Sequence, residues 1–353
     1  MEDKETIALI EIGGSHDECL LTQLHALYSA KKRIVFIATQ DLLDRNPWFD
    51  GYIDETFVIE KTEIEKRFLA AKKIKRILKK ENVSKAILNT AHGNVVRNLC
   101  LLSLFSKIEF IGIMHSIAKL KGSLTQSIIG LKIKKYFLLS EFLRAKAKKS
   151  TRLNTSYFYP VRFYFEKMEL PIKEKKRIVV IGGVENRRKD LSGFVKMIAN
   201  ISIAVDFVFL GKSDPESDEV IAFKAELQNK GLESKVQLFD HFVSNDFFTE
   251  TVMSCDAILP LVHPNTPSAQ EYFNNQISGA MTVAFGFKKP LLIHKAYSHI
   301  EEMKIASLYY TEESFCTIIE QDNKMIEREK TMQESSELKV ETQEKRYLNF
   351  LEN

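Results

Sequence analysis

Residues 177–198, RIVVIGGVENRRKDLSGFVKMI, decide the fold of the chain. The run 177–181 is short, apolar and rich in β-branched residues, which is typical of a buried strand in a parallel sheet. Gly182 and Gly183 then allow a tight turn, or the close approach of a bound group. After Asp190 the apolar residues recur at helical spacing, so a helix is expected to follow the turn. The stretch therefore predicts one strand–turn–helix unit of an α/β domain.

The turn of this unit carries three consecutive cations, Arg187, Arg188 and Lys189. Backbone N–H groups and the dipole at a helix N-terminus supply partial positive charge, and the side chains add full charges. This combination predicts a phosphate-binding site. A basic surface turn without a ligand is the alternative, because the chain is rich in lysine.

Length and composition limit the possible classes of protein. A chain of 353 residues favours two domains or one large one, and a net charge of +4 is too small to indicate a nucleic-acid partner. The four cysteines lie far apart in the sequence, which fits a reducing compartment and predicts no metal site. The acidic start does not resemble a signal peptide, and no apolar run reaches the roughly 18 residues of a membrane span. We expect a cytoplasmic protein.

Strand and helix patterns alternate along almost the whole chain, which predicts open, doubly wound parallel sheets. The expected strands are 7–12, 33–38, 86–89, 110–114, 136–139, 178–181, 205–210, 236–239, 257–261 and 290–294. A long helix is expected over 62–80, with Phe68 and Leu69 on its inner face. The predicted domains are residues 1–158 and 177–323, joined by a linker over 159–176, and residues 324–353 are expected to form a charged helix.

Ligands of such sheets bind beyond the carboxyl ends of the strands. Polar or glycine residues follow several of the expected strands: Gly13, Gly14, His92, His115, Arg187, Arg188, Lys189, Gly211, Lys212 and His241. If the two domains face each other, all of these border one central cleft, which is a favoured place for a small molecule.

The order of these features resembles that of the GT-B glycosyltransferases, in particular the retaining group 1 or family 4 enzymes. The resemblance covers most of the chain. It is carried by IALIEIGGSHDECLLTQLHAL, FIGIMHSI, YFLLSEFLRAKAKK, IGGVENRRKDLSGF, FVFLGKSD, VQLFDHFVSNDFFTETVMSCDAILPL and EYFNNQISGAMTVAFGFKKPLLI. It implies a GT-B fold of two Rossmann-like domains, with the acceptor on the N-terminal domain and the nucleotide sugar on the C-terminal one.

The resemblance also implies roles for individual residues. Those expected at the catalytic centre are His115 near the donor sugar, Arg188 and Lys189 on the donor pyrophosphate, and Glu271 on the sugar. Those expected to bind the donor are Gly13, Gly14, Arg187, Gly211, Lys212, His241, Phe242, Val243, Tyr272, Ser278, Gly279 and Ala280. No metal ligand and no cofactor are implied, and the donor is a UDP- or GDP-linked sugar.

Two departures from the family pattern concern this donor site. Gly183 stands where the family has an arginine, and Arg188 stands where it has a lysine. The second glutamate of the paired-glutamate motif is replaced by Gly279, eight positions after Glu271. The Ser278 hydroxyl and the backbone amides at a helix start could replace the contact of that carboxylate with the ribose.

The resemblance predicts a metal-independent glycosyltransferase. It would move a sugar from a nucleotide-diphosphate sugar to a glycan or lipid-linked glycan, with retention, in surface-polysaccharide biosynthesis. A degenerate GT-B protein acting as a non-catalytic partner subunit and a nucleotide-sugar epimerase are the alternatives. The basic faces 72–80 and 132–149 are either solvated helix faces or peripheral contacts with an anionic membrane, which would be the inner face of the plasma membrane.

Overall fold

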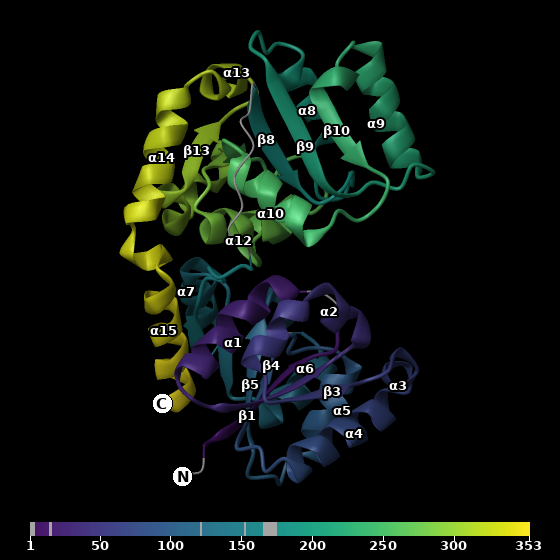
Figure 1. The fold of residues 1–353 in the computed structure, drawn as a ribbon, viewed down its shortest axis with the longest axis vertical. Helices are drawn as coiled ribbons and strands as arrows, with labels where there is room; N and C mark the ends of the chain where they lie inside the picture. The colour runs from purple at the N-terminus through teal and green to yellow at the C-terminus, as the bar shows by residue number, and fades with distance from the viewer. Residues whose placement is uncertain (1–3, 14–15, 121, 152, 165–174) are drawn as a thin grey trace. The chain divides into compact units, whose positions relative to one another are not determined.

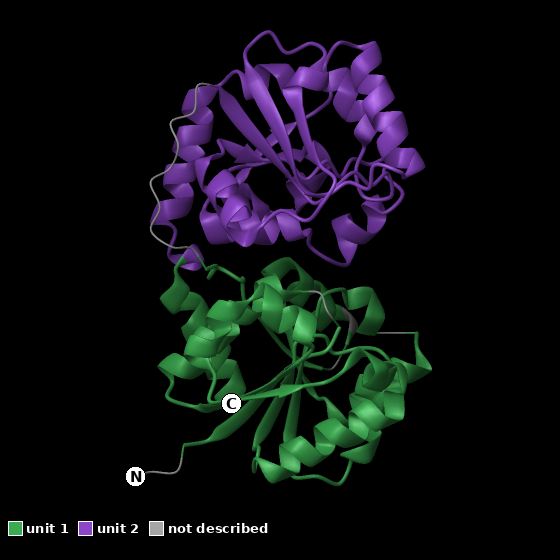
Figure 2. Ribbon diagram, turned by 45° about the vertical axis from the view of Figure 1, so that its right-hand side comes forward, with its two compact units in different colours: residues 1–164, 339–353 green, residues 165–338 purple. Residues whose placement is uncertain are grey.

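The computed structural model describes residues 4–13, 16–120, 122–151, 153–164 and 175–353. The chain forms two compact units, which are coloured separately in Figure 2. Unit 1 holds residues 1–164 together with 339–353, and unit 2 holds residues 165–338. The division after residue 164 falls within the predicted linker, most of which lies outside the described residues.

Unit 1 is built on a sheet of seven parallel strands in the order β3-β2-β1-β4-β5-β6-β7 (Figure 1). The strands are β1 (Thr6–Glu11), β2 (Arg33–Ala38), β3 (Glu55–Val58), β4 (Lys85–Leu88), β5 (Glu109–Met114), β6 (Lys135–Leu138) and β7 (Asn154–Tyr157). The central strand β1 pairs with β2 through Ile7 and Ile34, and with β4 through Ile7 and Lys85. Its apolar side chains are buried, as expected for a strand covered on both faces.

The helices of unit 1 are α1 (Leu20–Ser29), α2 (Gln40–Arg45), α3 (Lys61–Glu65), α4 (Arg67–Lys80), α5 (Asn94–Leu102), α6 (Leu124–Lys132), α7 (Glu141–Ser150) and α15 (Val340–Glu352). α4, α5 and α6 pack side by side in that order, whereas α15 packs against α1 and β7. The right-handed crossovers of a parallel sheet account for α4, α5 and α6 lying on one face.

Unit 2 has a sheet of six parallel strands in the order β10-β9-β8-β11-β12-β13. The strands are β8 (Lys176–Ile181), β9 (Val205–Lys212), β10 (Val236–Phe239), β11 (Ala257–Ile258), β12 (Leu291–His294) and β13 (Ser307–Tyr310). The helices are α8 (Leu191–Ile198), α9 (Asp218–Asn229), α10 (Asn245–Ser254), α11 (Ala269–Asn274), α12 (Gly279–Phe287), α13 (Phe315–Ile319) and α14 (Asp322–Glu334). Phe194 of α8 packs edge-to-face on Phe207 and Phe209 of β9, which fixes this helix over the sheet.

The predicted fold class is confirmed, since each unit is a doubly wound parallel α/β domain. The facing of the two domains across a central cleft stays a prediction. Three strands escaped the sequence analysis, namely β3, β7 and β13, and all three lie at an edge of their sheet. β3 and β7 are partly exposed, so they do not need the continuous apolar run that marks a central strand.

Two helix predictions differ from the structure. The helix expected over 62–80 is interrupted at Lys66, which separates α3 from α4, and Phe68 and Leu69 are exposed rather than buried. The range 324–353, expected as one charged helix, contains most of α14 and all of α15, with Ser335 between them ending α14 in an extended conformation. α14 belongs to unit 2 and α15 to unit 1. Among the described residues, no helix combines the length and the apolar character needed to cross a bilayer.

Candidate functional site

Each sheet has a switch point, where the strand order reverses. In unit 2 it lies between β8 and β11, and in unit 1 it lies between β1 and β4. Successive crossovers leave these adjacent strands in opposite directions, so a crevice opens beyond their carboxyl ends, where open α/β sheets bind ligands.

At the switch point of unit 2, three glycines bring two loops into backbone contact. A Cβ on Gly183 would overlap the carbonyl oxygen of Lys212, and a Cβ on Gly211 would overlap the backbone of Gly182 and Gly183. Gly182 also has a φ of +85°, a value that L-residues with side chains rarely adopt. These glycines therefore allow the segments after β8 and at the end of β9 to cross closely.

Lys189 is a buried cation, and the carboxylate whose charge acts on it, Glu185, makes no direct ion pair with it. Its side chain is 6% exposed, and its Nζ lies 3.2 Å from the position that a Cβ on Gly182 would occupy. Among the described residues, this ammonium group has no hydrogen-bond or ion-pair partner. Burial, with a further contribution from the charge of Arg188, lowers the pKa of Lys189 to about 8, although the charge of Glu185 opposes this shift. A buried charge without a partner is costly, and such groups concentrate at functional sites.

Lys189 lines a cavity of about 140 Å³ next to the N-terminus of α12. The cavity is lined by Ile181, Gly182, Arg188, Lys189, Pro260, Val262, Tyr272, Ser278, Gly279 and Ala280, and none of these residues is acidic. Ser278 caps α12, and its Oγ accepts a hydrogen bond of 3.2 Å from the Ala280 N–H. The ammonium group and the positive end of the helix dipole therefore meet at one cavity, which suits an anion.

The two arginines beside Lys189 share one carboxylate. Arg188 Nε lies 2.6 Å from Glu185 Oε2, and Arg187 Nη2 lies 3.0 Å from Glu185 Oε1. Arg188 also lines the cavity, as does Tyr272, whereas the exposed side chain of Arg187 does not. The Arg187 carbonyl instead accepts hydrogen bonds from the backbone N–H and the hydroxyl of Ser268. Of the three cations predicted for the phosphate, the structure thus brings Arg188 and Lys189 to the cavity.

A buried hydrogen-bond network supports this loop from behind. His263 Nδ1 lies 2.8 Å from Asp190 Oδ2, and the Tyr310 hydroxyl lies 2.7 Å from His263 Nε2. Asp190 also caps α8 by accepting from the Gly193 N–H at 2.9 Å, while its own N–H donates to the Leu261 carbonyl. The hydrogen bond with His263 is the main cause that lowers the pKa of Asp190 to about 2.

The sequence analysis did not single out this network. The only signal was the position of His263 after an apolar strand, and its partners are 73 and 47 residues away in the chain. Leu261, next to the cavity-lining residues Pro260 and Val262, has a φ of +58°. This rare backbone conformation lets its carbonyl meet the N-terminus of α8.

Other residues predicted for the donor site lie outside the lining of this cavity. Lys212 is exposed at the end of β9, and Glu271 on α11 accepts a 2.9 Å hydrogen bond from the side-chain amide of Asn275. The residues after β10 form an open surface: His241 is exposed and pairs with Asp240 at 2.6 Å. Phe242 is 81% exposed, and Val243 is half-buried.

At the switch point of unit 1, Glu11 is a buried carboxylate that organises two loops. Its Oε1 accepts from the Gly13 N–H at 2.5 Å, and its Oε2 accepts from the Asn89 amide at 2.8 Å and the Thr90 hydroxyl at 2.7 Å. Burial raises the pKa of Glu11 despite these donors. Gly14, the second glycine predicted for this loop, lies outside the described residues.

Two histidines stack beside this carboxylate. The rings of His16 and His115 are nearly parallel, at 15°, with centroids 3.6 Å apart. His115 Nε2 donates to the Asn89 carbonyl at 2.7 Å, and its buried Nδ1 has no hydrogen-bond partner among the described residues. Burial and the neighbouring His16 lower the pKa of His115 to about 3, so its ring is neutral at physiological pH.

His92 lies at the same edge of the sheet. Its Nε2 is 3.0 Å from the ammonium group of Lys119, and burial together with this charge lowers the pKa of His92 to about 4. A neutral imidazole therefore accepts from a lysine here. The carboxyl ends of these strands therefore present both hydrogen-bond donors and hydrogen-bond acceptors, which are the groups needed to orient hydroxyl-rich molecules.

A chain of hydrogen bonds joins this edge to α15. The Tyr347 hydroxyl donates to Gln23 Oε1 at 3.1 Å, and Gln23 Nε2 donates to Asn89 Oδ1 at 2.8 Å. Asn89 in turn donates to Glu11. The C-terminal helix therefore helps to fix the side chains at the switch point.

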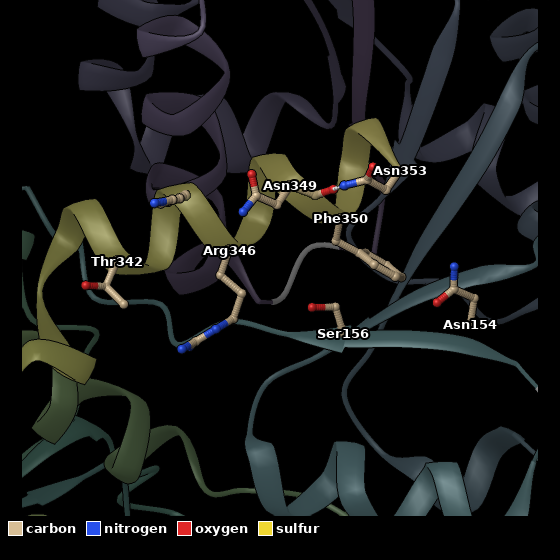
Figure 3. Close-up of a pocket in the computed structure, with 8 residues that line it drawn as sticks. Asn154, Ser156, Thr342, Arg346, Asn349, Phe350 and Asn353 are labelled. Carbon is tan, nitrogen blue, oxygen red and sulfur yellow. Dashed lines mark hydrogen bonds between the residues drawn. The ribbon is translucent and has the colours of Figure 1, made fainter.

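Unit 1 also has a larger pocket of about 490 Å³, away from the switch point (Figure 3). It lies between the edge strand β7 and α15. Figure 3 shows Arg346 and Phe350 extending from the helix toward the strand that carries Asn154 and Ser156. The Arg346 guanidinium lies over the ring of Tyr157, 4.2 Å from its centroid. This cation–π contact stabilises the positively charged Arg346 side chain against an aromatic face.

Comparisons with known proteins agree with the fold. The chain is similar to a glycosyltransferase from Rickettsia africae, with a TM-score of 0.68 and 12% identity over 99% of this chain and 100% of that one. HepE from Anabaena, in complex with UDP-glucose, gives a TM-score of 0.70 and 12% identity over 98% and 99% of the two chains. A putative UDP-N-acetylglucosamine 2-epimerase from Listeria monocytogenes gives a TM-score of 0.65 and 11% identity over 99% and 96%.

No protein-family model matches the sequence, and the comparison with curated proteins finds no match. The similarity to solved structures extends over both units, and at 11–12% identity it concerns the fold. The retaining family 4 subtype stays a prediction. The chain therefore has the GT-B fold, a glycosyltransferase-like fold whose solved examples include complexes with UDP-sugars.

Proposed function

We propose that the protein is a glycosyltransferase that moves a sugar from a nucleotide-diphosphate sugar to a glycan or lipid-linked glycan acceptor. The observation that carries the proposal is the buried, unpaired ammonium group of Lys189, beside the N-terminus of α12 in a cavity without acidic residues. A diphosphate would supply a negatively charged partner in direct contact with this ammonium group. HepE is known in complexes with UDP and with UDP-glucose, and this similarity favours a UDP-linked over a GDP-linked donor.

In such a transfer the bond between the anomeric carbon and the diphosphate oxygen breaks, and negative charge grows on the leaving phosphate. Lys189, Arg188 and the α12 N-terminus are proposed to stabilise this charge. Each donor of this kind contributes about 2–4 kcal/mol in a site shielded from water. With these groups in place the departure of the diphosphate does not depend on a divalent metal, so EDTA is expected to leave the activity unchanged.

The acceptor is proposed to bind at the switch point of unit 1, with His115 near the transferred sugar. The neutral imidazoles of His92 and His115 suit hydrogen bonds with hydroxyl groups, since neither carries a positive charge at physiological pH. In a retaining transfer the leaving phosphate itself accepts the proton of the acceptor hydroxyl. Retention, a cytoplasmic location and a role in surface-polysaccharide assembly are parts of this proposal.

A nucleotide-sugar epimerase is the second candidate, because a putative epimerase shares the fold. That reaction removes and returns protons on the sugar, which calls for acid and base groups around the donor. The absence of acidic residues from the lining of the Lys189 cavity favours the transferase. A non-catalytic partner subunit would have no use for a buried cation that destabilises its own fold.

Thermal stabilisation by UDP, GDP, UDP-sugars and GDP-sugars tests the donor site in wild-type protein, Lys189→Met and Lys196→Met. Lys196 is an exposed lysine of α8, so its variant makes the same chemical change outside the cavity. Ligand at a hundred times its dissociation constant stabilises a protein by about 2.7 kcal/mol. We expect this shift with a uridine ligand in wild type and Lys196→Met, and its loss in Lys189→Met. Equal shifts in all three proteins, or none in wild type, would refute the site.

Product analysis then separates the two enzyme classes. A transferase releases UDP from the bound UDP-sugar when an acceptor is present. An epimerase changes the configuration of the sugar while the sugar remains attached to UDP. A protein that binds the nucleotide sugar and does neither, with a broad acceptor panel, would support the partner-subunit alternative.

A further inference from the structure

The middle of unit 1 has an unusually one-sided charge. Between Glu81 and Glu141 the sequence contains one carboxylate, Glu109, which pairs with Lys135 at 2.7 Å. The same stretch contains eight cations: Lys85, Arg97, Lys107, Lys119, Lys121, Lys132, Lys134 and Lys135. Arg97 lies on α5 and Lys132 on α6, while Lys107 and Lys134 lie in the segments that follow these helices, so the ends of the two helices are basic.

Apolar side chains project from this basic surface. Phe105, in the turn between α5 and β5, is fully exposed at 102%. Leu101 near the end of α5 and Leu131 near the end of α6 are also exposed, at 43% and 58%. α5 and α6 pack side by side, and both helices end near the amino ends of the strands that follow them, β5 and β6. A phenylalanine exposed to this degree does not gain the free energy that burial of its ring would contribute to folding.

Two lysines hold this turn from opposite neighbours. Lys75 of α4 donates from Nζ to the Leu102 carbonyl, and Lys132 of α6 donates to the Ser106 carbonyl at 2.8 Å. Both carbonyls belong to the segment that presents Phe105. The segment that carries Phe105 is therefore held between two ammonium groups, and the exposed Lys107 lies two residues after Phe105.

These residues are called the basic wedge: the apolar tip Leu101, Phe105 and Leu131, and the cations Lys75, Lys107, Lys132 and Lys134. We propose that the basic wedge inserts its apolar tip into an anionic lipid bilayer. An apolar tip among cations matches the bilayer surface, where anionic headgroups lie above acyl chains. Each lysine near such a surface contributes on the order of 1 kcal/mol.

Charge argues against a second copy of this chain as the occupant. A two-fold interface brings the same patch of both subunits together, so the basic wedge would face its own cations. The wedge lies near the amino ends of the strands of unit 1, whereas the switch-point site lies at their carboxyl ends. A bilayer bound to the wedge would therefore leave that site uncovered. The inference goes beyond the proposed function and does not rest on it. The basic wedge shares Lys75, Lys132 and Lys134 with the basic faces 72–80 and 132–149, and it adds Lys107 and an apolar tip that neither face contains.

Sedimentation with vesicles tests the proposal. Vesicles of phosphatidylglycerol and phosphatidylcholine in equal parts are compared with vesicles of phosphatidylcholine alone, using the full chain. We expect wild-type protein to bind the anionic vesicles and to be released by salt. Phe105→Ser is expected to bind about tenfold more weakly or worse, because the ring is lost from the tip. Phe105→Trp is expected to retain binding.

Further variants separate charge from apolar contact. Lys107→Gln with Lys134→Gln removes two cations and is expected to weaken binding by about tenfold or more. Ile326→Ser, which removes an exposed apolar side chain from α14 in unit 2, is the matched control and is expected to bind as wild type. Equal binding to both kinds of vesicle, or to neither, would overturn the proposal. Self-association that Phe105→Ser abolishes, without vesicle binding, would overturn it in favour of an interface between copies.

Discussion

The imidazole rings of His16 and His115 stack face to face, with centroids 3.6 Å apart, but the two groups differ in their tendency to carry charge. Burial opposes protonation of His16, yet the hydrogen bond and charge of Glu18 and the charge of Glu11 outweigh it and raise the pKa of His16. Among the described residues no carboxylate pairs with His115, and burial together with His16 lowers its pKa to about 3. The stack therefore places a ring that can be charged on a ring that stays neutral.

Glu18→Gln is expected to lower the pKa of His16, because it removes the larger of the two carboxylate contributions. A histidine with a raised pKa in the folded state stabilises the fold below its unfolded pKa of about 6.5, and this stabilisation is lost as the pH rises through the folded value. The variant should thus be less stable than wild type below about pH 6.5, by a few tenths to about 1 kcal/mol, and equally stable at higher pH. Imidazole NMR titration measures the pKa directly. An unchanged His16 pKa in Glu18→Gln would contradict this account.

Lys189→Met is expected to stabilise the fold while removing nucleotide binding. The folded-state pKa of about 8 lies below the ordinary value of 10.5, so the folded protein binds fewer protons between these values and its stability rises with pH there. Near neutral pH the buried charge therefore opposes folding, and the methionine should raise the free energy of unfolding by about 1–3 kcal/mol. Urea unfolding at pH 7 and pH 10 measures both effects. A less stable variant would indicate that Lys189 has a structural partner after all.

The pH dependence of nucleotide affinity has the opposite sign. A diphosphate binds the charged form of Lys189, so the affinity should fall as the pH rises through about 8. Calorimetric titration with UDP between pH 7 and pH 9 measures this change, and Lys196→Met provides the control. An affinity that stays constant over this range would show that Lys189 is not in contact with the diphosphate.

Asp190→Asn is expected to destabilise unit 2 mainly by weakening the bond to His263. Asparagine is a good helix cap, so the interaction with the Gly193 N–H is retained. A buried imidazole that loses its charged partner costs about 1–3 kcal/mol. The pKa of Asp190 is depressed, so its stabilisation is present above about pH 4 and is lost as the pH falls toward about 2. The difference between Asp190→Asn and wild type in acid unfolding should accordingly shrink in this range.

Gly211→Ala is expected to destabilise unit 2 by about 2–4 kcal/mol, because the new methyl group would overlap the backbone of Gly182 and Gly183. Gly279→Ala is the matched control, since a Cβ there meets nothing within 4 Å. Thermal unfolding compares the two variants. Similar stability of both would mean that the loops after β8 and β9 move apart without cost.

The sequence predicted the central strands well because they are buried on both faces and therefore form apolar runs. The edge strands β3 and β7 contain Glu55, Thr56, Asn154, Thr155 and Ser156, and nothing local distinguishes these residues from a loop. Phe68 and Leu69 were predicted to be buried from their helical spacing. That spacing does not reveal how far the neighbouring element that would cover them extends. Tertiary context decided each of these cases.

At the candidate site, the glycines and cations were recognisable from local patterns, but the different contacts that each of them makes were not. Gly183 and Gly211 act on each other across two strands, and the different roles of Arg187 and Lys189 depend on which way each side chain leaves the loop. The Asp190–His263–Tyr310 network joins three distant parts of the chain, so no spacing rule could indicate it.

The place of α15 in unit 1 has a consequence for biosynthesis. Tyr347 is fully buried against Phe137 and Phe158, and its hydroxyl begins the chain of hydrogen bonds that reaches Glu11. The ribosome makes all of unit 2 before it makes this helix, so unit 1 lacks one of its packed helices until unit 2 has been synthesised. Unit 2 can therefore fold first during translation, whereas unit 1, although its strands are synthesised earlier, is completed only by α15.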